Sequence, residues 1–305
     1  MTNRPTRSRR RLLRAAALGA ALLLTGCSGQ DPGAAGDGAP QRVVALSTDV
    51  AEAALDIAGP DRLVAVPESS TTAAYGNHLA EAATVGTVLP PGATPDPEQV
   101  LSLDPDLVLV TGRHTGERDA ADQLEQAGAD VLAIDNEWTT VDEIADDHLA
   151  IGDALGEPER AADIVGELRT GLGTVDDELP AVGRQPRTLV LMWLSGKPYA
   201  VGPDSITSDL LRRAGVPLAV EEAGLTKSQA IDAEMLRKLN PEHIILVDRT
   251  GDGEDTFADL LGSPAAAEVP AVRNAGVTAI SANKISASSG RFLVDGYREM
   301  LRAIR

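Results

Sequence analysis

The sequence predicts an α/β fold of two doubly wound lobes with parallel sheets, joined by one long rigid helix. Two stretches, 96–110 and 232–246, match each other at an offset of 136 residues. Each opens with an Asp that can cap a helix and continues with apolar residues at helical spacing. After an Asp-Pro or Asn-Pro pair, each ends in an apolar run typical of a buried parallel strand. Strand-like and helix-like segments alternate along the rest of the chain, which is the pattern of doubly wound sheets.

The first lobe is expected to begin with a strand at 42–46 and a helix at 50–58. Ser47-Thr48-Asp49 can cap this helix, and Gly59-Pro60 stops it. A polar loop is expected at 67–75. The remaining segments, in chain order, are strands at 63–66 and 84–88, the first repeat unit with its strand at 107–111, a helix at 119–127 and a strand at 131–134.

The connection between the lobes is expected to be helical. Residues 141–155 form one helical pattern, and 159–179 form a second, longer one that suits a stiff connector. The second lobe then repeats the order of the first. Its segments are a strand at 187–193, a helix at 205–214, the second repeat unit, helical pieces at 259–261 and 265–269, a strand at 277–280 and a helix at 292–304.

The N-terminus predicts export. Residues 1–26 hold six arginines, no acid and a short apolar run at 15–24, which is too short to remain as a membrane-spanning helix. The segment 24–27, Leu-Thr-Gly-Cys, looks like a bacterial lipobox, which implies cleavage before Cys27 and a lipid on its sulfur. Cys27 is the chain's single cysteine. Residues 8–14 also resemble a twin-arginine signal, so either export route is open.

These patterns divide the chain into five expected parts. They are a signal peptide at 1–26, a lipidated flexible tether at 27–41, an N-terminal lobe at 42–153, a connecting helix at 154–182 and a C-terminal lobe at 183–305. The protein is therefore expected on the extracytoplasmic face of the cell membrane, held by its lipid.

Composition narrows the partners. The chain of 305 residues carries a net charge of −19, which argues against nucleic acid because a basic face is expected there. Aromatic residues make up only 2%, so the core must be aliphatic and few side chains can stack on a flat ligand.

An ordered set of short motifs resembles one family. In the first half they are Arg-Val-Val-Ala-Leu-Ser at 42–47, Glu52, Asp-Arg-Leu-Val-Ala-Val at 61–66, Val-Gly at 85–86 and the segment from Glu98 to 109. In the second half they are 201–205, 210–215 and 269–272. The chain from 42 to 305 looks like the substrate-binding proteins (class III of the periplasmic binding proteins) that serve ABC importers of iron chelates, haem and cobalamin.

The resemblance implies a role and partners. It implies a binding protein with no enzymatic activity and no cofactor of its own, whose cleft between the lobes takes a small molecule. The partners are then a permease dimer with its ATPase. In this family one surface glutamate on each lobe docks onto permease arginines, and the matching positions are Glu98 and Glu234. Exposed charges of this kind set orientation and association rate more than affinity.

The ligand is expected outside the carboxyl ends of the strands of both lobes. The leading candidates there are Tyr75, Arg113, His114, Trp138, Lys197, Tyr199, Lys227, Lys284 and Arg291. Arg249 and Asn283 also follow strands, and Arg291 can equally be structural, near the start of the last helix. Because basic and hydroxyl side chains outnumber aromatic ones at these exits, the expected ligand is a ferric siderophore.

Other ligands and classes stay open. Haem would need an axial ligand, for which Tyr75 is the candidate, opposed by Tyr199 or His114. Cobalamin fits poorly, because Thr87, Thr226 or Lys227, and Lys284 stand where family members place tryptophans. The four scattered histidines do not suit a zinc or manganese carrier, and no direct metal site is expected. An exported two-lobed hydrolase is the enzymatic alternative, but G-x-S-x-G, H-E-x-x-H and P-loop motifs are absent from the sequence.

Overall fold

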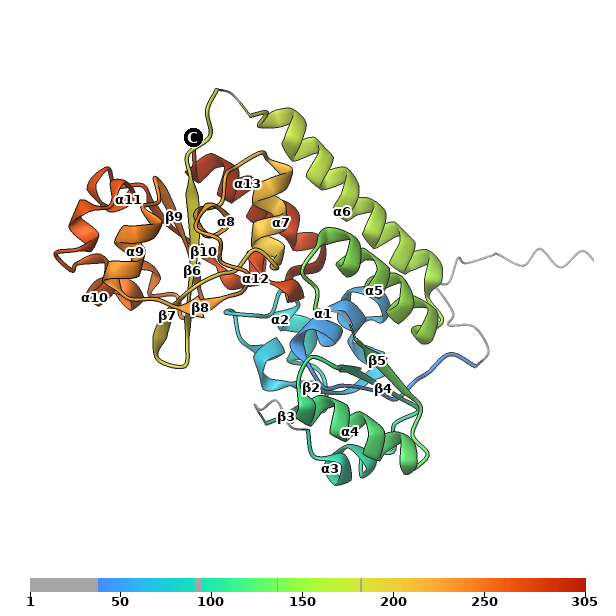
Figure 1. The fold of residues 1–305 in the computed structure, drawn as a ribbon. Helices are drawn as coiled ribbons and strands as arrows, with labels where there is room; N and C mark the ends of the chain where they lie inside the picture. Colours follow the sequence, from blue (N-terminus) through green and yellow to red (C-terminus); the bar gives the residue numbers. More distant parts are fainter. Residues whose placement is uncertain (1–37, 91–94, 136, 182) are drawn as a thin grey trace, which may run out of the picture. The chain divides into compact units, whose positions relative to one another are not determined.

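The computed structural model describes residues 38–90, 95–135, 137–181 and 183–305 (Figure 1). The expected signal peptide, Cys27 and most of the tether lie outside these residues. Within the described part of the chain, no helix has the length and apolarity that crossing a membrane requires.

The first sheet has five parallel strands in the order β3-β2-β1-β4-β5. They are β1 (Val43–Ala45), β2 (Leu63–Pro67), β3 (Thr87–Leu89), β4 (Leu107–Thr111) and β5 (Val131–Ile134). The strand order reverses between β1 and β4, so loops leaving these two strands diverge and open a crevice at their carboxyl ends.

This sheet is covered on both faces, as the doubly wound prediction requires. In β1, Val43 and Ala45 belong to one apolar cluster with α1 and α5, whereas Val44 belongs to another with α3 and α4. Figure 1 shows these two pairs of helices on opposite sides of the sheet. The five helices are α1 (Thr48–Ala58), α2 (Leu79–Ala82), α3 (Pro97–Leu101), α4 (Thr115–Gln126) and α5 (Val141–Leu155).

Three boundaries in this lobe differ from prediction. Helix α4 starts about one turn before the predicted 119, because the Glu117 carboxylate accepts a hydrogen bond from the backbone N–H of His114 at 3.0 Å and caps the earlier turn. Strand β3 starts at Thr87, not 84, and the expected loop at 67–75 contains a 3₁₀ turn, η2 (Glu68–Thr71).

One long helix, α6 (Pro158–Glu178), follows α5 and precedes the second sheet in the chain (Figure 1). Its glycines do not break it. At Gly171 an added Cβ would lie 2.7 Å from the Val294 side chain of α13 (Leu293–Ala303), so this glycine allows the two helices to pack closely.

The second sheet is mixed, which corrects the prediction of a wholly parallel sheet. Its order is β10-β9-β6-β7-β8, where β6, β9 and β10 are parallel and β7 and β8 are antiparallel. The turn between β6 and β7 has Ser195 and Gly196 at positive φ, which suits a two-residue hairpin. The strands are β6 (Thr188–Leu194), β7 (Lys197–Ala200), β8 (Gln229–Ala230), β9 (His243–Asp248) and β10 (Val277–Ser281).

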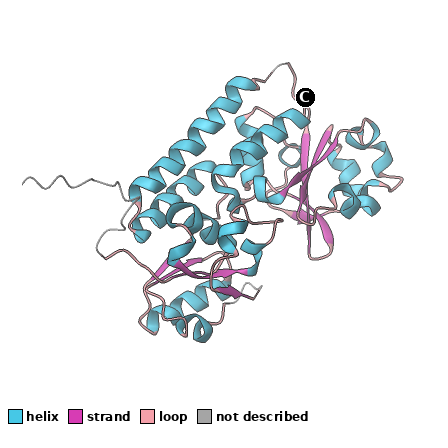
Figure 2. Cartoon of the chain, turned by 180° about the vertical axis from the view of Figure 1, so that it is seen from behind, coloured by secondary structure: helices cyan, strands magenta, loops and turns pink. Residues whose placement is uncertain are grey.

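Helices flank this sheet as well (Figure 2). Besides α13 they are α7 (Ile206–Arg213), α8 (Ala219–Glu222), α9 (Ala233–Leu239), α10 (Ala258–Leu261), α11 (Pro270–Arg273) and α12 (Ala282–Ile285), with 3₁₀ segments η3 (Gly253–Phe257), η4 (Ala266–Glu268) and η5 (Ala287–Phe292). The predicted repeat is present as α3–β4 and α9–β9. In both copies the Asp caps the helix: Asp96 accepts from Glu98 N at 3.0 Å and Asp232 from Met235 N at 2.8 Å.

Candidate ligand-binding cleft

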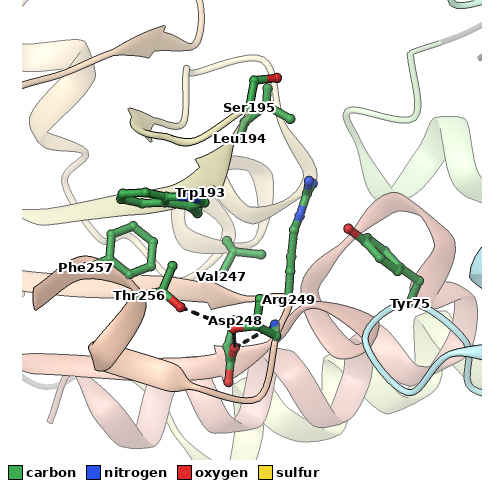
Figure 3. A pocket seen from close by; sticks show the side chains of 10 residues that line it. Tyr75, Trp193, Leu194, Ser195, Val247, Asp248, Arg249, Thr256 and Phe257 are labelled. Atoms are coloured by element: carbon green, nitrogen blue, oxygen red, sulfur yellow. Dashed lines mark hydrogen bonds between the residues drawn. The ribbon is translucent and has the colours of Figure 1, made fainter.

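Two neighbouring cavities lie at the carboxyl ends of the strands. The first, of about 250 Å³, is lined by Tyr75 of the first lobe and by second-lobe residues that include Trp193, Arg249 and Phe257 (Figure 3). The second, of about 280 Å³, is lined from the first lobe by Arg113, Glu137, Trp138 and Thr139, and from the second by residues such as Met192, Ser205, Thr207 and Ser228. Because Val247 and Arg249 line both, we treat the two cavities as one cleft.

Strand topology brings these side chains together. Arg113 follows β4 and Trp138 follows β5, on the same edge of the first sheet. Trp193 lies near the end of β6, and Arg249 directly follows β9. The cleft thus occupies the place where ligands bind in open α/β sheets.

Arg249 is the cation of the cleft that has no acidic partner. Its guanidinium carbon lies 5.6 Å from the centre of the Tyr75 ring (Figure 3). Among the described residues, no carboxylate lies within ion-pair distance of it, and its buried Nε has no hydrogen-bond partner. The neighbouring Asp248 is occupied, because it accepts from the N–H groups of Thr250 and Gly251. A partly buried, unpaired guanidinium favours an anionic ligand.

Arg113 has a different environment on the first lobe. It is ion-paired with Asp49 of α1, and its side chain is 23% exposed. Burial lowers the pKa of Arg113, while the charges of Glu117 and Glu137 act in the opposite direction. An arginine stays protonated under such shifts, so Arg113 remains a cation, but Asp49 already compensates much of its charge.

Aromatic side chains form much of the cleft wall. The chain holds only two Trp, three Tyr and two Phe, yet both Trp, one Tyr and one Phe line the cleft. Trp193 packs edge-to-face on Phe257 with ring centres 5.7 Å apart. Trp138 is 1% exposed and lies 6.0 Å from the His148 ring. The expectation that basic side chains outnumber aromatic ones is therefore wrong for the cleft, where the ratio is reversed.

The comparison with known proteins identifies the family. Residues 43–283 match the family model described as "Periplasmic binding protein". The chain belongs to this family. It is 24% identical over 269 residues to the "Uncharacterized ABC transporter substrate-binding lipoprotein YvrC" of Bacillus subtilis, covering 87% of this chain and 80% of that protein. It is 25% identical to the "Cobalamin-binding protein" of Halobacterium salinarum, covering 84% of this chain and 68% of that protein.

Solved structures share the fold of this periplasmic binding protein. A periplasmic haem-binding protein from Pseudomonas aeruginosa superposes with a TM-score of 0.73 at 24% identity, covering 87% of this chain and 92% of that one. An ABC-type Fe³⁺-hydroxamate transport protein from Saccharomonospora viridis gives 0.67 at 22% identity, covering 88% and 94%. The expected family and the two-lobed α/β fold are confirmed, and the relatives are solute-binding proteins of ABC importers for iron-related ligands or cobalamin.

Of the expected ligand contacts, three line the cleft of this binding protein: Tyr75, Arg113 and Trp138. The other six are not among its lining residues. His114 is exposed at the start of α4, Lys197 and Tyr199 lie on β7, and Lys227 is exposed beside the lining residue Ser228. Lys284 is paired with Glu299 at 2.5 Å. Arg291 is paired with Asp56 at 2.9 Å and Glu167 at 3.1 Å, in agreement with the structural alternative for this residue.

Three lining residues were missed or ranked too low. Arg249 was expected only as one strand exit among many, and Trp193 and Phe257 were not expected at all. The available signal was positional for two of them, since Trp193 ends a predicted strand and Arg249 directly follows the strand of the second repeat. Phe257 lies in η3 and carries no such signal.

The two expected docking glutamates are both on the surface. Glu98 lies on α3, is exposed, and forms no ion pair with a described residue. Glu234 lies on α9 with its side chain 71% exposed and is paired with Arg237 at 3.1 Å. Their docking role remains a prediction.

Proposed function

We propose that this periplasmic binding protein captures haem and delivers it to an ABC importer, with Tyr75 as the iron ligand. The observation that carries the proposal is the position of Tyr75, which reaches the cleft from the first lobe opposite the unpaired Arg249 of the second. A tyrosine oxygen is an established ligand of haem iron.

The walls of the cleft support the same ligand. Haem is flat and apolar across its ring and carries two carboxylates at one edge. Trp193, Phe257 and Trp138 offer apolar surface to the ring, and Arg249 offers a cation to a carboxylate. The structural likeness to a haem-binding protein from Pseudomonas aeruginosa agrees with this proposal but supports only the fold.

A ferric siderophore is the second candidate, and it rests on the arginines. Arg249 and Arg113 face the cleft from opposite lobes, so an anionic chelate could bridge them. Such a chelate fills the iron coordination itself and would need no oxygen from Tyr75.

A titration decides between the candidates. Both tryptophans line the cleft, so their fluorescence reports occupancy. The purified protein is titrated with haemin, with ferrioxamine B as a hydroxamate siderophore, and with cobalamin. We expect saturable quenching and a shifted visible absorption band with haemin only. Saturable binding of ferrioxamine B or cobalamin without haemin binding would refute the haem assignment.

The attachment to the membrane is also proposed. We infer that Cys27 carries a lipid and that residues 28–41 tether the lobes to the extracytoplasmic surface, where the permease is reached. Mass spectrometry of the membrane fraction should find a diacylglycerol-modified N-terminal peptide that begins at Cys27. An unmodified Cys27 in membrane-bound protein would contradict the lipid anchor.

A further inference from the structure

The short segment Tyr75–Gly76–Asn77–His78, here called the Tyr75 segment, is held from below by one buried carboxylate. Glu52, on α1, is 4% exposed. Its Oε2 accepts hydrogen bonds from the backbone N–H of Asn77 at 2.8 Å and of His78 at 3.2 Å, and it lies 3.0 Å from Nδ1 of His78. One side chain therefore fixes two consecutive amides and a ring.

The same segment is tied to the second lobe on its other side. The Asn77 amide donates to the carbonyl of Asn283 at 2.8 Å, and the Asn283 amide donates to the carbonyl of Gly76 at 3.4 Å. Ser288 donates to the carbonyl of Tyr75 at 3.5 Å. Each residue from Tyr75 to Asn77 thus has a polar contact with the second lobe.

The segment has little room to move as a body. A Cβ at Gly76 would lie 2.4 Å from the backbone oxygen of Ser70, so only glycine permits this approach. His78 is held between two carboxylates, with Nε2 3.6 Å from Asp56. Asp56 in turn is paired with Arg291 at 2.9 Å and Arg160 at 3.5 Å. Opposite charges surround Glu52 and stabilise its ionised form.

We propose that Glu52 is a positioning residue for ligand binding: it fixes the Tyr75 segment so that the Tyr75 ring stays in the cleft opposite Arg249. Glu52 is not among the residues that line the cleft, so it acts through Tyr75. The inference rests on the proposed function only where it takes Tyr75 as a contact of the ligand. The position of the ring itself is tested without a ligand.

Fluorine NMR provides that test. The chain has three tyrosines, so protein labelled with 3-fluorotyrosine gives three resonances, and Tyr75→Phe identifies the one from Tyr75. Three substitutions are compared. Glu52→Ala removes the acceptor, Glu52→Asp keeps the charge beside His78 but withdraws the acceptor by one methylene, and Glu52→Gln keeps an oxygen in place. The matched control is Glu117→Ala, because Glu117 is a buried acid of the same lobe that also accepts from a backbone N–H, that of His114.

We expect Glu52→Ala and Glu52→Asp to move or broaden the Tyr75 resonance while those of Tyr199 and Tyr297 stay in place, and Glu52→Gln to restore the wild-type position. Haemin affinity should fall roughly tenfold in the first two variants, which corresponds to about one lost hydrogen bond. An unchanged Tyr75 resonance in Glu52→Asp, or an equal change in Glu117→Ala, would overturn the inference. If wild-type protein does not bind haemin, only the proposed function fails, because the resonances are recorded on ligand-free protein.

Discussion

Arg249 and Tyr75 face each other across the cleft from different lobes, with the guanidinium carbon 5.6 Å from the ring centre. This cation–π contact is the strongest polar partner that the described residues offer to Arg249, since its closest other contact is the Met192 sulfur at 4.0 Å. An anionic ligand that enters the cleft can therefore bind Arg249 without breaking an ion pair.

The first prediction concerns this arginine. Arg249→Gln should weaken binding of an anionic ligand by about 10- to 100-fold, the equivalent of one charged hydrogen bond. The melting temperature should hardly change, because Arg249 forms no ion pair with a described residue. Isothermal titration with the bound chelate measures the first effect and calorimetric unfolding the second. Arg212→Gln is the control, because Arg212 is paired with Glu221 at 2.7 Å and is not among the lining residues of the cleft. Equal loss in both variants would contradict a specific role for Arg249.

The second prediction separates the two candidate ligands at Tyr75. Tyr75→Phe keeps the ring beside Arg249 and removes only the hydroxyl group. If haem iron binds the tyrosine oxygen, this variant should lose the ligand-to-iron absorption band and most of its haemin affinity. A siderophore complex needs no protein oxygen and should bind Tyr75→Phe almost as well as wild type. Visible spectra of the two loaded proteins distinguish these outcomes, and an unchanged haemin spectrum in Tyr75→Phe would exclude Tyr75 as the iron ligand.

Much of the fold could be predicted because it follows from local patterns. Alternating burial in β1 and β4 and the capping Asp residues at 96 and 232 are written in consecutive residues, so the repeat and both lobes were recovered. The hairpin of β6 and β7 was missed although its turn, Ser195-Gly196, has suitable residues for positive φ. Two-residue turns need pairing partners on both sides, and the second partner, Pro198–Ala200, is too short to show a period.

The cleft was harder to predict, because strand ends locate an edge and not the direction of each side chain. Arg249 and Lys284 both follow strands of the second sheet. Arg249 reaches the cleft, whereas Lys284 is drawn to Glu299, fifteen residues further along the chain, by the packing of α12 on α13. Such pairs depend on how helices pack, which the sequence pattern alone does not specify.

The third prediction concerns pH and His78. Burial alone would lower the pKa of His78, but hydrogen bonds and charges of Asp56 and Glu52 outweigh it and raise the pKa to about 9. In the unfolded chain the ordinary value is near 6.5. The protonated histidine therefore stabilises the fold fully below pH 6.5, and this contribution is lost as the pH rises toward 9, by up to roughly 3 kcal/mol.

Unfolding by urea at a series of pH values measures this effect. The free energy of unfolding should fall between pH 6.5 and 9 in wild type and stay flatter in His78→Gln. His148 and His243 act in the opposite direction, because burial lowers the pKa of each and their contribution is lost as the pH falls below the unfolded value. An identical slope above pH 6.5 in wild type and His78→Gln would show that His78 does not carry the charge assigned to it.

The last prediction concerns docking through Glu98 and Glu234. Both are exposed, so charge reversal should change folding by at most about 1 kcal/mol. Against arginines of a permease the same change sets like charges together, which costs several kcal/mol. Glu98→Arg and Glu234→Arg should each keep ligand affinity and lose uptake, and the double variant should be worse. Because Glu234 already pairs with Arg237 whereas Glu98 has no such partner, we expect the larger loss from Glu98→Arg.

Uptake by cells and by reconstituted vesicles measures the effect, which should weaken at high salt because partly exposed pairs are screened. Asp163→Arg is the matched control: it is an exposed acid on α6 without an ion pair to a described residue, and its reversal changes the net charge equally. Lost uptake in Asp163→Arg as well would point to a general effect of charge. Normal uptake by the double Glu98 and Glu234 variant, at normal expression, would refute docking through these glutamates and leave ligand binding in the cleft unaffected.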